Sequence, residues 1–334
     1  MFSEVSFGDV VKPAVLSVSV ALVATPLVRH FMLKFNIVDT PNERSSHSVV
    51  VPRGGGLAII IAVFAGLAIS KPGQPIVAVA AASLLLGIVG LMDDHSGLSA
   101  RVRLLAQAAV GAGLCVALLA QQSDVGLLGV AGLTVGIVGF IGFVNAFNFM
   151  DGINGISVAQ AVVTGVFFVV VGISSELPDV ALAGALIAGA FVGFAPFNTP
   201  VAFIFLGDAG SYFAGAWLAG VAVLAATQGV PVEVVVLPGL FYIADTLVTL
   251  VARFRRGAPI GQSHREHAYQ MLTDRIGSHI AVSALVGLGV AITATIGLAV
   301  LNAEPAVRAA SAFVAAFATI AVVVTVRTFN GTSS

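Results

Sequence analysis

Residues 125–152 read VGLLGVAGLTVGIVGFIGFVNAFNFMDG, an uninterrupted apolar run that ends in amides and an acid. About twenty apolar residues are the length that a helix needs to cross the hydrocarbon core of a bilayer. Only helices and closed barrels satisfy their backbone hydrogen bonds in lipid, and this run shows no alternation of period two. The stretch therefore predicts a transmembrane helix that carries a group of polar side chains at one end.

The composition extends this prediction to the whole chain. Of its 334 residues, 58% are hydrophobic and 9% are charged, whereas soluble domains carry about a quarter charged residues. We expect an all-α polytopic membrane protein whose residues 1–334 form a single domain. About 11 transmembrane helices are predicted, with about 10 as the alternative because the second and seventh runs are short and rich in glycine. The runs lie at 10–33, 56–70, 75–92, 102–120, 125–146, 157–174, 180–196, 209–228, 232–252, 279–301 and 306–326.

Charge and cysteine content exclude several classes of protein. The formal net charge of −1 gives no bulk field that would attract nucleic acid or an acidic partner, so we expect no nucleic acid to bind. The single cysteine, Cys115, excludes an intrachain disulfide framework. Residues 1–12 lack the basic region of a cleavable signal peptide, and the run that follows is long enough to span the membrane.

The basic residues are distributed unevenly between the two sides of the predicted bundle. Cytoplasmic loops of membrane proteins carry an excess of Lys and Arg. We therefore expect the amino terminus outside, the carboxyl terminus in the cytoplasm, and the polar clusters on the cytoplasmic side. Lys12, Lys71 and Arg308 fall on the outer side. The remaining 12 of the 15 basic residues fall on the inner side, at Arg29, Lys34, Arg44, Arg53, Arg101, Arg103, Arg253, Arg255, Arg256, Arg265, Arg275 and Arg327.

The stretch DTPNERSSHSVVVPRGGGLA at 39–58 is the first polar cluster. Its prolines break helices, and the glycines at 54–56 allow another part of the chain to approach closely. Arg44, His47 and Arg53 are candidates for holding a phosphate, to which the glycines would donate backbone N–H groups. A flexible loop that leads into a helix is the alternative interpretation.

Two adjacent acids, Asp93 and Asp94, lie at the inner end of the third predicted span. Two carboxylates this close disfavour each other's charged form, so they favour a metal ion, another cation or a proton nearby. Arg101 and Arg103 follow closely in the sequence. An ion-paired helix end is therefore the alternative.

The most specific cluster follows the fifth predicted span. Asn145, Asn148 and Asp151 are spaced three residues apart and would share roughly one face of a continuing helix. A turn explains Gly152 and the glycine that follows Asn154. It does not explain three amides and an acid at the end of an apolar span, so we interpret the cluster as part of a binding site.

Asp208 lies at the start of the eighth predicted span, in the sequence FLGDAGS at 205–211. An ordinary helix N-cap is one interpretation. A ligand for a hard cation is the other, because Mg²⁺ takes one or two protein oxygens together with phosphate oxygens. Asn198 contributes a further amide on the same side of the membrane.

The longest inner loop, 253–275, contains the sequence SHREHAYQ. His264 and His267 are candidates for donating hydrogen bonds to diphosphate oxygens, since no cysteine or acid pattern completes a zinc site.

Asp245 is the one acid placed clearly inside a span, about two turns from its inner end. An acid there is functional or paired by default. A loop arginine as partner and a proton path are the alternatives.

Five of these motifs, in this order, resemble the polyprenyl-phosphate N-acetylhexosamine-1-phosphate transferases. These form the glycosyltransferase family 4 group, which includes the translocase that makes the first lipid intermediate of peptidoglycan. The likeness covers about residues 34–275, the expected catalytic core, and HREHAYQ is similar to the subgroup that starts O-antigen and related surface polysaccharides. The motifs are DTPNERSSH…PRGGG, DD…LS…R…Q at 93–107, NxxNxxDGxNG at 145–155, FN…IFLGDAGS at 197–211 and D…R…HREHAYQ at 245–270.

The resemblance implies a reaction and its participants. A phosphoglycosyltransferase would pass a (N-acetyl)hexosamine 1-phosphate from a UDP-sugar to undecaprenyl or another polyprenyl phosphate, release UMP, and start a cell-envelope glycan. Mg²⁺ would be the cofactor, with Mn²⁺ as the alternative. The enzyme would lie in the inner membrane of a bacterial-type cell with its active site facing the cytoplasm. Its partners would be the UDP-N-acetylhexosamine, the polyprenyl phosphate and membrane lipid, and a homodimer would be compatible with the family.

By position, the resemblance assigns roles to the residues of these motifs. Asp208 would hold the metal with Asn148 as a helper, and Asp93 and Asp94 would position or deprotonate the lipid phosphate. The uridine pocket would be lined by Asp151, Gly152, Asn154, Asn198 and Phe205. The diphosphate or the sugar would contact His264, Arg265 and His267.

Two departures from the family pattern and one rival function need weighing. Phe203 stands near the place where a basic residue usually precedes Ile-Phe, and Gly97 stands where an acid often follows the paired aspartates; both bear on the choice of sugar. The rival is a multi-span transporter of a lipid-linked or proton-coupled solute, which would place polar residues near mid-membrane on several spans. Only Asp245 lies there. The motif DGxxAR…GxxxD…D of CDP-alcohol phosphotransferases is not found.

Overall fold

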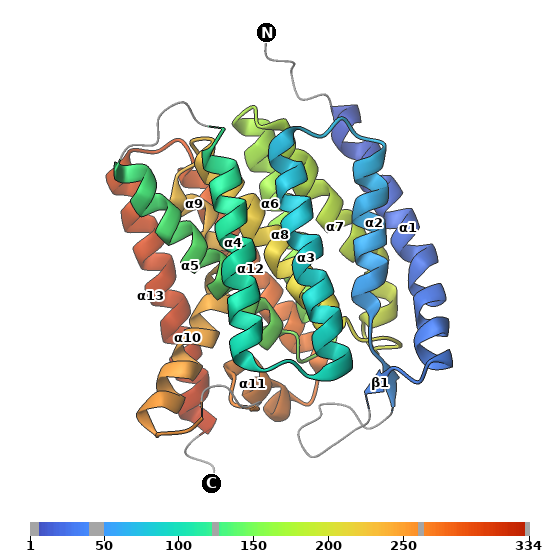
Figure 1. The fold of residues 1–334 in the computed structure, drawn as a ribbon. Helices are drawn as coiled ribbons and strands as arrows, with labels where there is room; N and C mark the ends of the chain where they lie inside the picture. The colour runs from blue at the N-terminus through green and yellow to red at the C-terminus, as the bar shows by residue number, and fades with distance from the viewer. Residues whose placement is uncertain (1–6, 40–49, 122–126, 260–263, 331–334) are drawn as a thin grey trace.

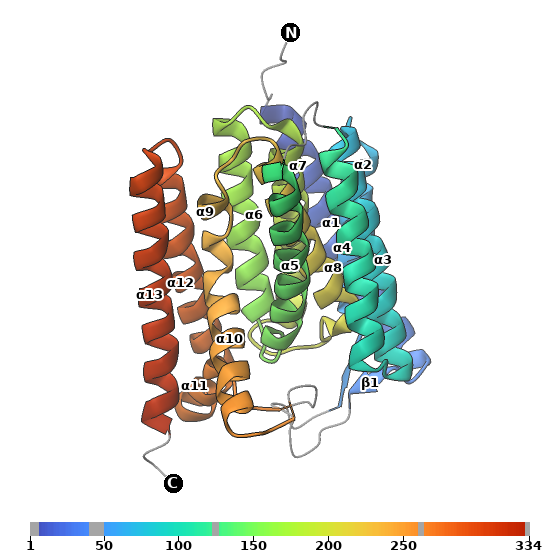
Figure 2. The same ribbon diagram turned by 60° about the vertical axis from the view of Figure 1, so that its left-hand side comes forward.

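The computed structural model describes residues 7–39, 50–121, 127–259 and 264–330. They form a bundle of long helices joined by short connections, with one small two-stranded sheet (Figure 1, Figure 2). The strands are β1 (Val38–Asp39) and β2 (Val51–Pro52). The helices are α1 (Phe7–Lys34), α2 (Gly55–Ala68), α3 (Gln74–Ser96), α4 (Ala100–Leu119), α5 (Leu127–Met150), α6 (Ile156–Ser174), α7 (Pro178–Asn198), α8 (Gly207–Thr227), α9 (Val232–Val235), the 3-10 helix η1 (Leu237–Gly239), α10 (Leu240–Arg255), α11 (Ala268–Ile276), α12 (His279–Val300) and α13 (Pro305–Asn330).

The prediction of an all-α polytopic membrane protein is confirmed. Among the described residues, 10 helices are long and apolar enough to cross a membrane. One of them is α7, predicted as a short run, which has 21 residues. The run predicted at 56–70 falls below this length, because α2 has 14 residues. Its rise is about 21 Å against a hydrocarbon core of about 30 Å. Helix length alone would give the lower of the two predicted counts, but α2 also runs along the bundle beside α1 (Figure 1) and so adds one further passage to these 10 helices.

The run predicted at 232–252 is not one continuous helix. It is divided into α9, η1 and α10. Pro238 lies in η1 and has no N–H group to donate to the helical ladder. The backbone is therefore interrupted in the half of this run that lies away from the polar clusters.

The two ends of the bundle carry different connections. At one end, here called the site end, lie the small sheet, α11 and the turn between α3 and α4 (Figure 1). The carboxyl ends of α5 and α10 also point to the site end (Figure 2). The polar clusters predicted on one side of the membrane therefore gather there. α1 begins at the opposite end and α13 ends at the site end, as an odd number of crossings with α2 included requires (Figure 1). Which end faces the cytoplasm stays a prediction.

α8 lies at the centre of the bundle, and glycines let its neighbours approach it closely. In its apolar window 83% of the residues are buried, against 11% in α13. A Cβ atom on Gly56 of α2 would lie 2.2 Å from the Cα atom of Gly210. A Cβ atom on Gly90 of α3 would lie 2.2 Å from the backbone oxygen of Asp208. Since these distances exclude a side chain, the glycines bring the paired acids of α3 to the first turn of α8.

The small sheet ties α2 to the loop before α8. β1 and β2 pair antiparallel, and Arg53 continues the second strand into a parallel bridge with Phe205. Gly55 and Gly56 donate their N–H groups to the carbonyl oxygens of Phe205 and Leu206 at 2.8 and 2.9 Å. The hypothesis that these two glycines offer N–H groups to a phosphate is therefore wrong, because packing already uses both groups.

Candidate active site

Asp94 anchors the first turn of α8 from the end of α3. Its carboxylate oxygens accept the backbone N–H groups of Asp208 at 3.1 Å and of Ala209 at 3.0 Å. Negative charge is favourable at a helix amino terminus, because the first N–H groups have no partner within the helix. The capping role considered for Asp208 thus belongs to Asp94, and it brings the two residues together.

Asp93, the neighbouring acid, is buried among hydrogen-bond donors. It accepts the N–H group of Leu98 at 2.7 Å, the hydroxyl of Tyr212 at 3.0 Å and Nη1 of Arg103 at 3.2 Å. A carboxylate whose side chain is only 5% exposed needs such donors. The ion-paired interpretation is therefore correct for Asp93 and Arg103. A role of Asp93 toward a lipid phosphate stays a prediction.

Asp208 contacts the end of α5 through Asn148. The amide nitrogen of Asn148 donates to Oδ1 of Asp208 at 2.7 Å and to Oγ of Ser211 at 2.9 Å. Among the described residues, no hydrogen bond reaches Oδ2 of Asp208. An amide nitrogen cannot ligate a cation, so in this arrangement Asn148 orients Asp208. Its own role as a metal ligand stays a prediction.

Asp151, directly after α5, adds a third carboxylate to the group formed by Asp94 and Asp208. It accepts the hydroxyl of Ser157 at 2.6 Å. The pKa of Asp151 is raised from 3.8 to about 7. Burial is the main cause, the charges of Asp208 and Asp94 also raise the pKa, and the hydrogen bond from Ser157 lowers it. Three acids therefore share one region, whose negative charge favours a bound cation or proton.

These acids fit a Mg²⁺ ion that is shared with a phosphorylated substrate. The described part of the chain contains no group of three or more His, Cys, Asp or Glu side chains that would hold a metal alone. Mg²⁺ is commonly bound through one or two carboxylates together with waters and substrate phosphates. Asp208, with Oδ2 outside the hydrogen bond from Asn148, is the ligand that this geometry offers.

Asn154 and Asn198 join the loop after α5 to the loop before α8. Asn198 is buried; it accepts the N–H group of Gly155 at 2.8 Å and donates to the backbone oxygen of Ile204 at 3.2 Å. Asn154 donates to the backbone oxygen of Pro200 at 3.1 Å. Both amides hold loops together, and their contact with a nucleotide stays a prediction.

The histidine motif packs against the turn after α5. The rings of His264 and His267 are stacked with centroids 5.0 Å apart, and the rings of Phe149 and His267 lie 6.0 Å apart. Tyr269 donates its hydroxyl to the backbone oxygen of Phe149 at 3.0 Å. A Cβ atom on Gly152 would lie 2.1 Å from that hydroxyl, so a larger residue would displace it. Phe149 directly follows Asn148, which contacts Asp208. The end of α5 therefore connects the acids with the histidine motif.

The basic candidates that the structure describes take part in ion pairs. Arg53 pairs with Asp39 at 2.9 Å and interacts electrostatically with the acids of α3 and α8. Arg265 pairs with Asp274 at 2.8 Å. Contact of either arginine with a substrate stays a prediction. The candidates outside the described residues are Arg44 and His47.

Several residues of this site were not predicted from the sequence. Tyr212, Ser211 and Ser157 contact an acid or its amide partner. Tyr212 lies four residues after Asp208, so helical spacing places the two on one face and offers a weak signal. Phe149 has the character of an ordinary core aromatic and offers none. These contacts depend on how α3, α5, α6 and α8 pack.

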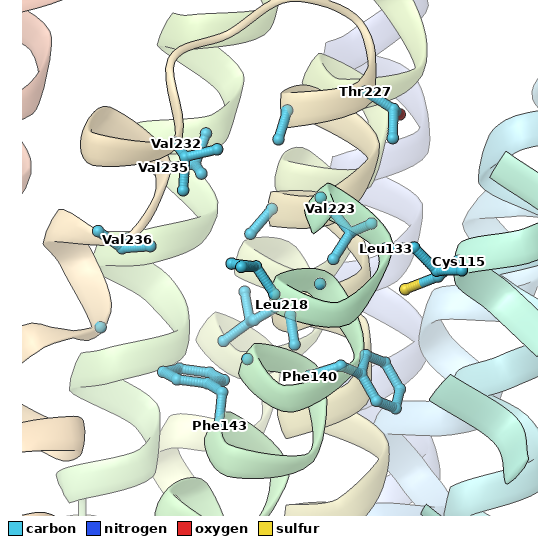
Figure 3. A pocket seen from close by; sticks show the side chains of 18 of the residues that line it. Cys115, Leu133, Phe140, Phe143, Leu218, Val223, Thr227, Val232, Val235 and Val236 are labelled. Carbon is cyan, nitrogen blue, oxygen red and sulfur yellow. The ribbon is translucent and has the colours of Figure 1, made fainter. Parts of the chain in front are cut away.

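An apolar cavity of about 410 Å³ lies between the helices, largely in the half of the bundle away from the polar site, and Figure 3 shows side chains that line it. It is bounded by α4, α5, α6, α8 and the segment from α9 to α10. Its lining includes Cys115, Leu133, Phe140, Phe143, Leu218, Val223, Thr227, Val232, Val235 and Val236.

Membrane-length helices, with three acids gathered at one end of the bundle and an apolar cavity between the helices, define a multi-pass membrane protein with a polar site at one end. Residues 76–226 match the model of glycosyl transferase family 4. The matched segment contains Asp93, Asp94, Asp151 and Asp208 and ends before the histidine motif.

Similar proteins are matched over most of their length. A probable undecaprenyl-phosphate N-acetylglucosaminyl 1-phosphate transferase of Bacillus subtilis (strain 168) is 28% identical over 276 residues, covering 77% of this chain and 75% of that protein. A decaprenyl-phosphate N-acetylglucosaminephosphotransferase of Mycobacterium leprae (strain TN) is 28% identical, with 80% and 77% covered. A phospho-N-acetylmuramoyl-pentapeptide-transferase of Shouchella clausii (strain KSM-K16) is 27% identical, with 72% and 82% covered. Over residues 76–226 the chain is similar to glycosyl transferase family 4, and the relatives named as phosphotransferases support an enzyme of the phosphoglycosyltransferase type.

Proposed function

We propose that this protein transfers an N-acetylhexosamine 1-phosphate from a UDP-sugar to undecaprenyl or another polyprenyl phosphate and releases UMP. The product would start O-antigen, another surface polysaccharide or a related cell-envelope glycan. The observation that carries the proposal is the grouping of Asp94, Asp208 and Asp151 at one end of a membrane-spanning bundle. An end of such a bundle is where a soluble phosphate donor and a lipid phosphate would meet. The relatives named for undecaprenyl and decaprenyl phosphate support the acceptor class.

The apolar cavity supports a polyprenyl acceptor. Phe143 lines the cavity, and Asn148, which contacts the Asp208 carboxylate, lies five residues further along α5. At 1.5 Å of rise per residue, this separation is about 7.5 Å along the helix. Apolar surface gains about 25 cal/mol per Å² when it leaves water. A prenyl chain held in the cavity would place its phosphate near the acids.

The chemistry is a displacement at phosphorus. An oxygen of the lipid phosphate attacks the phosphorus that carries the sugar, a new P–O bond forms, and UMP leaves with the electron pair of the broken bond. A phosphate monoester is largely dianionic near pH 7, because its second pKa is about 6. No strong base is needed, so positioning and electrostatic stabilisation carry most of the rate.

The contacts suggest how the residues divide this work. Mg²⁺, held by Asp208 and phosphate oxygens, would neutralise charge on the diphosphate. Asp94 keeps the first turn of α8, and with it Asp208, in place. The groups that would donate to the diphosphate or the sugar are His264, Arg265 and His267.

The hydrogen bonds of the paired acids support direct transfer over a route through an aspartyl phosphate. A nucleophilic carboxylate must direct a lone pair at phosphorus. Asp93 is buried and accepts three hydrogen bonds, and Asp94 accepts two from the backbone of α8. Trapping a labelled phosphoenzyme on either acid would contradict the direct route.

We further propose that the site end faces the cytoplasm of a bacterial-type inner membrane. The support is the excess of basic residues predicted on the side of the polar clusters. Replacing Gly257 or Asn302 by cysteine in a Cys115→Ser background tests this orientation. Membrane-impermeant thiol reagents should label the cysteine at position 302 from outside intact cells and the one at 257 only after lysis. The reverse pattern would overturn the orientation.

Release of UMP tests the proposed reaction. Purified protein in detergent is incubated with undecaprenyl phosphate, Mg²⁺ and each of several UDP-N-acetylhexosamines. We expect lipid-dependent UMP with at least one sugar, lost on addition of EDTA and in Asp208→Asn. Protein that is folded by thermal melting yet releases no UMP from any sugar would contradict the proposal and favour the transporter.

A further inference from the structure

Asp245 of α10 is an acid that the proposed chemistry does not use, and it is wholly buried within a membrane-spanning segment. Burying a carboxylate costs free energy unless donors surround it. Oδ1 accepts the N–H group of Ala268 at 2.8 Å and the hydroxyl of Thr249 at 3.2 Å. Oδ2 accepts the N–H group of Tyr269 at 3.1 Å. Asp245 therefore fixes the amino terminus of α11 from inside the bundle.

The contact of Asp245 with the start of α11 determines which groups of the histidine motif are left to bind a substrate. His267 immediately precedes α11, and its backbone N–H group is donated to Gln270 at 3.2 Å. Asp245 takes the N–H groups of the first two helical residues. The amino terminus of α11 is thus satisfied by the protein itself, so a diphosphate would meet the side chains of the motif and not the helix end.

Asp245 also lies beside the first of the two imidazole rings. Nδ1 of His267 lies 3.4 Å from Oδ1 of Asp245, and the His267 side chain is 2% exposed. The ring of His264 stacks on that of His267. An acid beside one imidazole nitrogen restricts the orientation of the ring. The arrangement therefore runs from a buried acid through one histidine to the second, half-buried one.

The same helix start holds the turn that leads to Asp151. Tyr269, whose N–H group Asp245 accepts, reaches the backbone oxygen of Phe149 with its hydroxyl. Gly152 offers no side chain that would displace this hydroxyl. A shift of α11 would therefore move the histidines and the turn between α5 and Asp151 together.

Basic residues of two helices contact the segment that precedes α11. Arg253 and Arg256 of α10 both pair with Glu266. Arg327 of α13 donates to the hydroxyl of Thr249 at 2.7 Å and to the backbone oxygen of Glu266, and it interacts electrostatically with Asp245. A loop arginine as the partner of Asp245 stays a prediction; the charge of Arg327 on the last helix acts on Asp245 through space.

We infer that Asp245 is a positioning residue, which through α11 holds the His264–His267 pair and the Phe149–Gly152 turn in register for the sugar-diphosphate donor. The inference rests on the proposed function for the identity of that donor. It assigns Asp245 neither a proton path nor a contact with substrate.

Kinetics of Asp245→Asn with both substrates varied test the inference. We expect kcat/KM for the UDP-sugar to fall at least tenfold, while the KM for polyprenyl phosphate stays within about twofold, because the lipid cavity does not include α11. The matched control is Asp179→Asn at the opposite end, where Oδ1 accepts the N–H group of Gly73 at 2.9 Å. That variant should leave both constants unchanged. Equal loss toward both substrates would overturn the inference.

A double-mutant cycle with His267→Asn separates positioning from a general loss of folding. If Asp245 acts through His267, the double variant should be no slower than His267→Asn alone. Multiplication of the two single effects would contradict action through this histidine.

Hydrogen exchange provides a readout that does not depend on turnover. In Asp245→Asn the backbone amides of Ala268 and Tyr269 should exchange faster, and in Asp179→Asn they should not. If the unaltered protein released no UMP, the proposed function would be contradicted. The exchange rates of Ala268 and Tyr269 would still test whether Asp245 stabilises the start of α11. If Asp245→Asn did not fold, Arg327→Gln replaces it. A folded Arg327→Gln with unaltered exchange in α11 and unaltered donor kcat/KM would overturn the inference.

Discussion

Both ends of the bundle use an acid to hold the start of a helix, yet the surroundings of these acids differ. At the opposite end, Asp179 accepts the N–H group of Gly73, and Glu233 pairs with Arg308 at 2.8 Å. Each of those acids has a partner of its own. At the site end, three acids lie close enough to influence one another's protonation. The two acids at the opposite end are paired separately, whereas those at the site end repel one another, which is typical of functional sites.

The largest contrast is expected between Asp208→Asn and Asp179→Asn. Loss of the Asp208 charge should lower UMP release on the order of a thousandfold, because electrostatic stabilisation of the transferring phosphoryl group is removed. Asp179→Asn should retain full turnover. Initial rates at saturating Mg²⁺ measure the effect, with melting curves to show that both variants fold. Equal rates for the two variants would remove the functional distinction between the ends.

A second contrast concerns the glycines that bring the helices together. Gly56→Ala would place a Cβ atom 2.2 Å from Gly210, so overpacking should cost about 1–3 kcal/mol and separate α2 from α8. Gly113→Ala on α4 is the matched control, because nothing lies within 4 Å of its Cβ position. Denaturation in detergent should show a lower melting temperature for Gly56→Ala only. An unchanged melting temperature would mean that the contact of α2 with α8 is not tight.

A third contrast is the pH dependence of stability without Mg²⁺. The pKa of Asp151 is about 7 in the folded protein, above the ordinary 3.8, chiefly because of burial. The folded state therefore binds this proton more tightly. Its contribution to stability is complete below about pH 4 and is lost as the pH rises through about 7. Asp151→Asn should flatten the decline of melting temperature over this range. A variant that declines as steeply as the unaltered protein would contradict the raised pKa.

The smallest effect is expected at the opposite end. Glu233→Gln removes an ion pair whose side chains are 30% and 19% exposed, for Glu233 and Arg308 respectively. Partly exposed pairs contribute about 0–1 kcal/mol, so the free energy of unfolding should change little and turnover not at all. A clear loss of UMP release in Glu233→Gln would show that the opposite end also takes part in the reaction.

The fold was largely accessible from the sequence, and the site was accessible only in outline. Each membrane span is encoded within about twenty consecutive residues, so hydropathy predicts it locally. The prediction was weakest for α2, which has only 14 residues. The clustering of Asp93, Asp94, Asp151 and Asp208 at one end follows from the same pattern, because all of them border spans. The partners of these acids do not follow from it.

By itself, the sequence determined a polytopic helical protein whose acids, amides and histidines gather at one end, since the cost of charge in lipid acts on every segment separately. The tertiary structure alone decided how those residues divide their work. Only in the folded protein does Asp93 accept hydrogen bonds from Arg103 and Tyr212. Asp94 accepts the N–H group of Asp208 at the start of α8, 114 residues further along the chain. Asp245 likewise accepts the N–H groups of Ala268 and Tyr269 at the start of α11. The physical reason is that a hydrogen bond requires two groups within about 3 Å, and only the packing of helices far apart in the chain brings these groups that close.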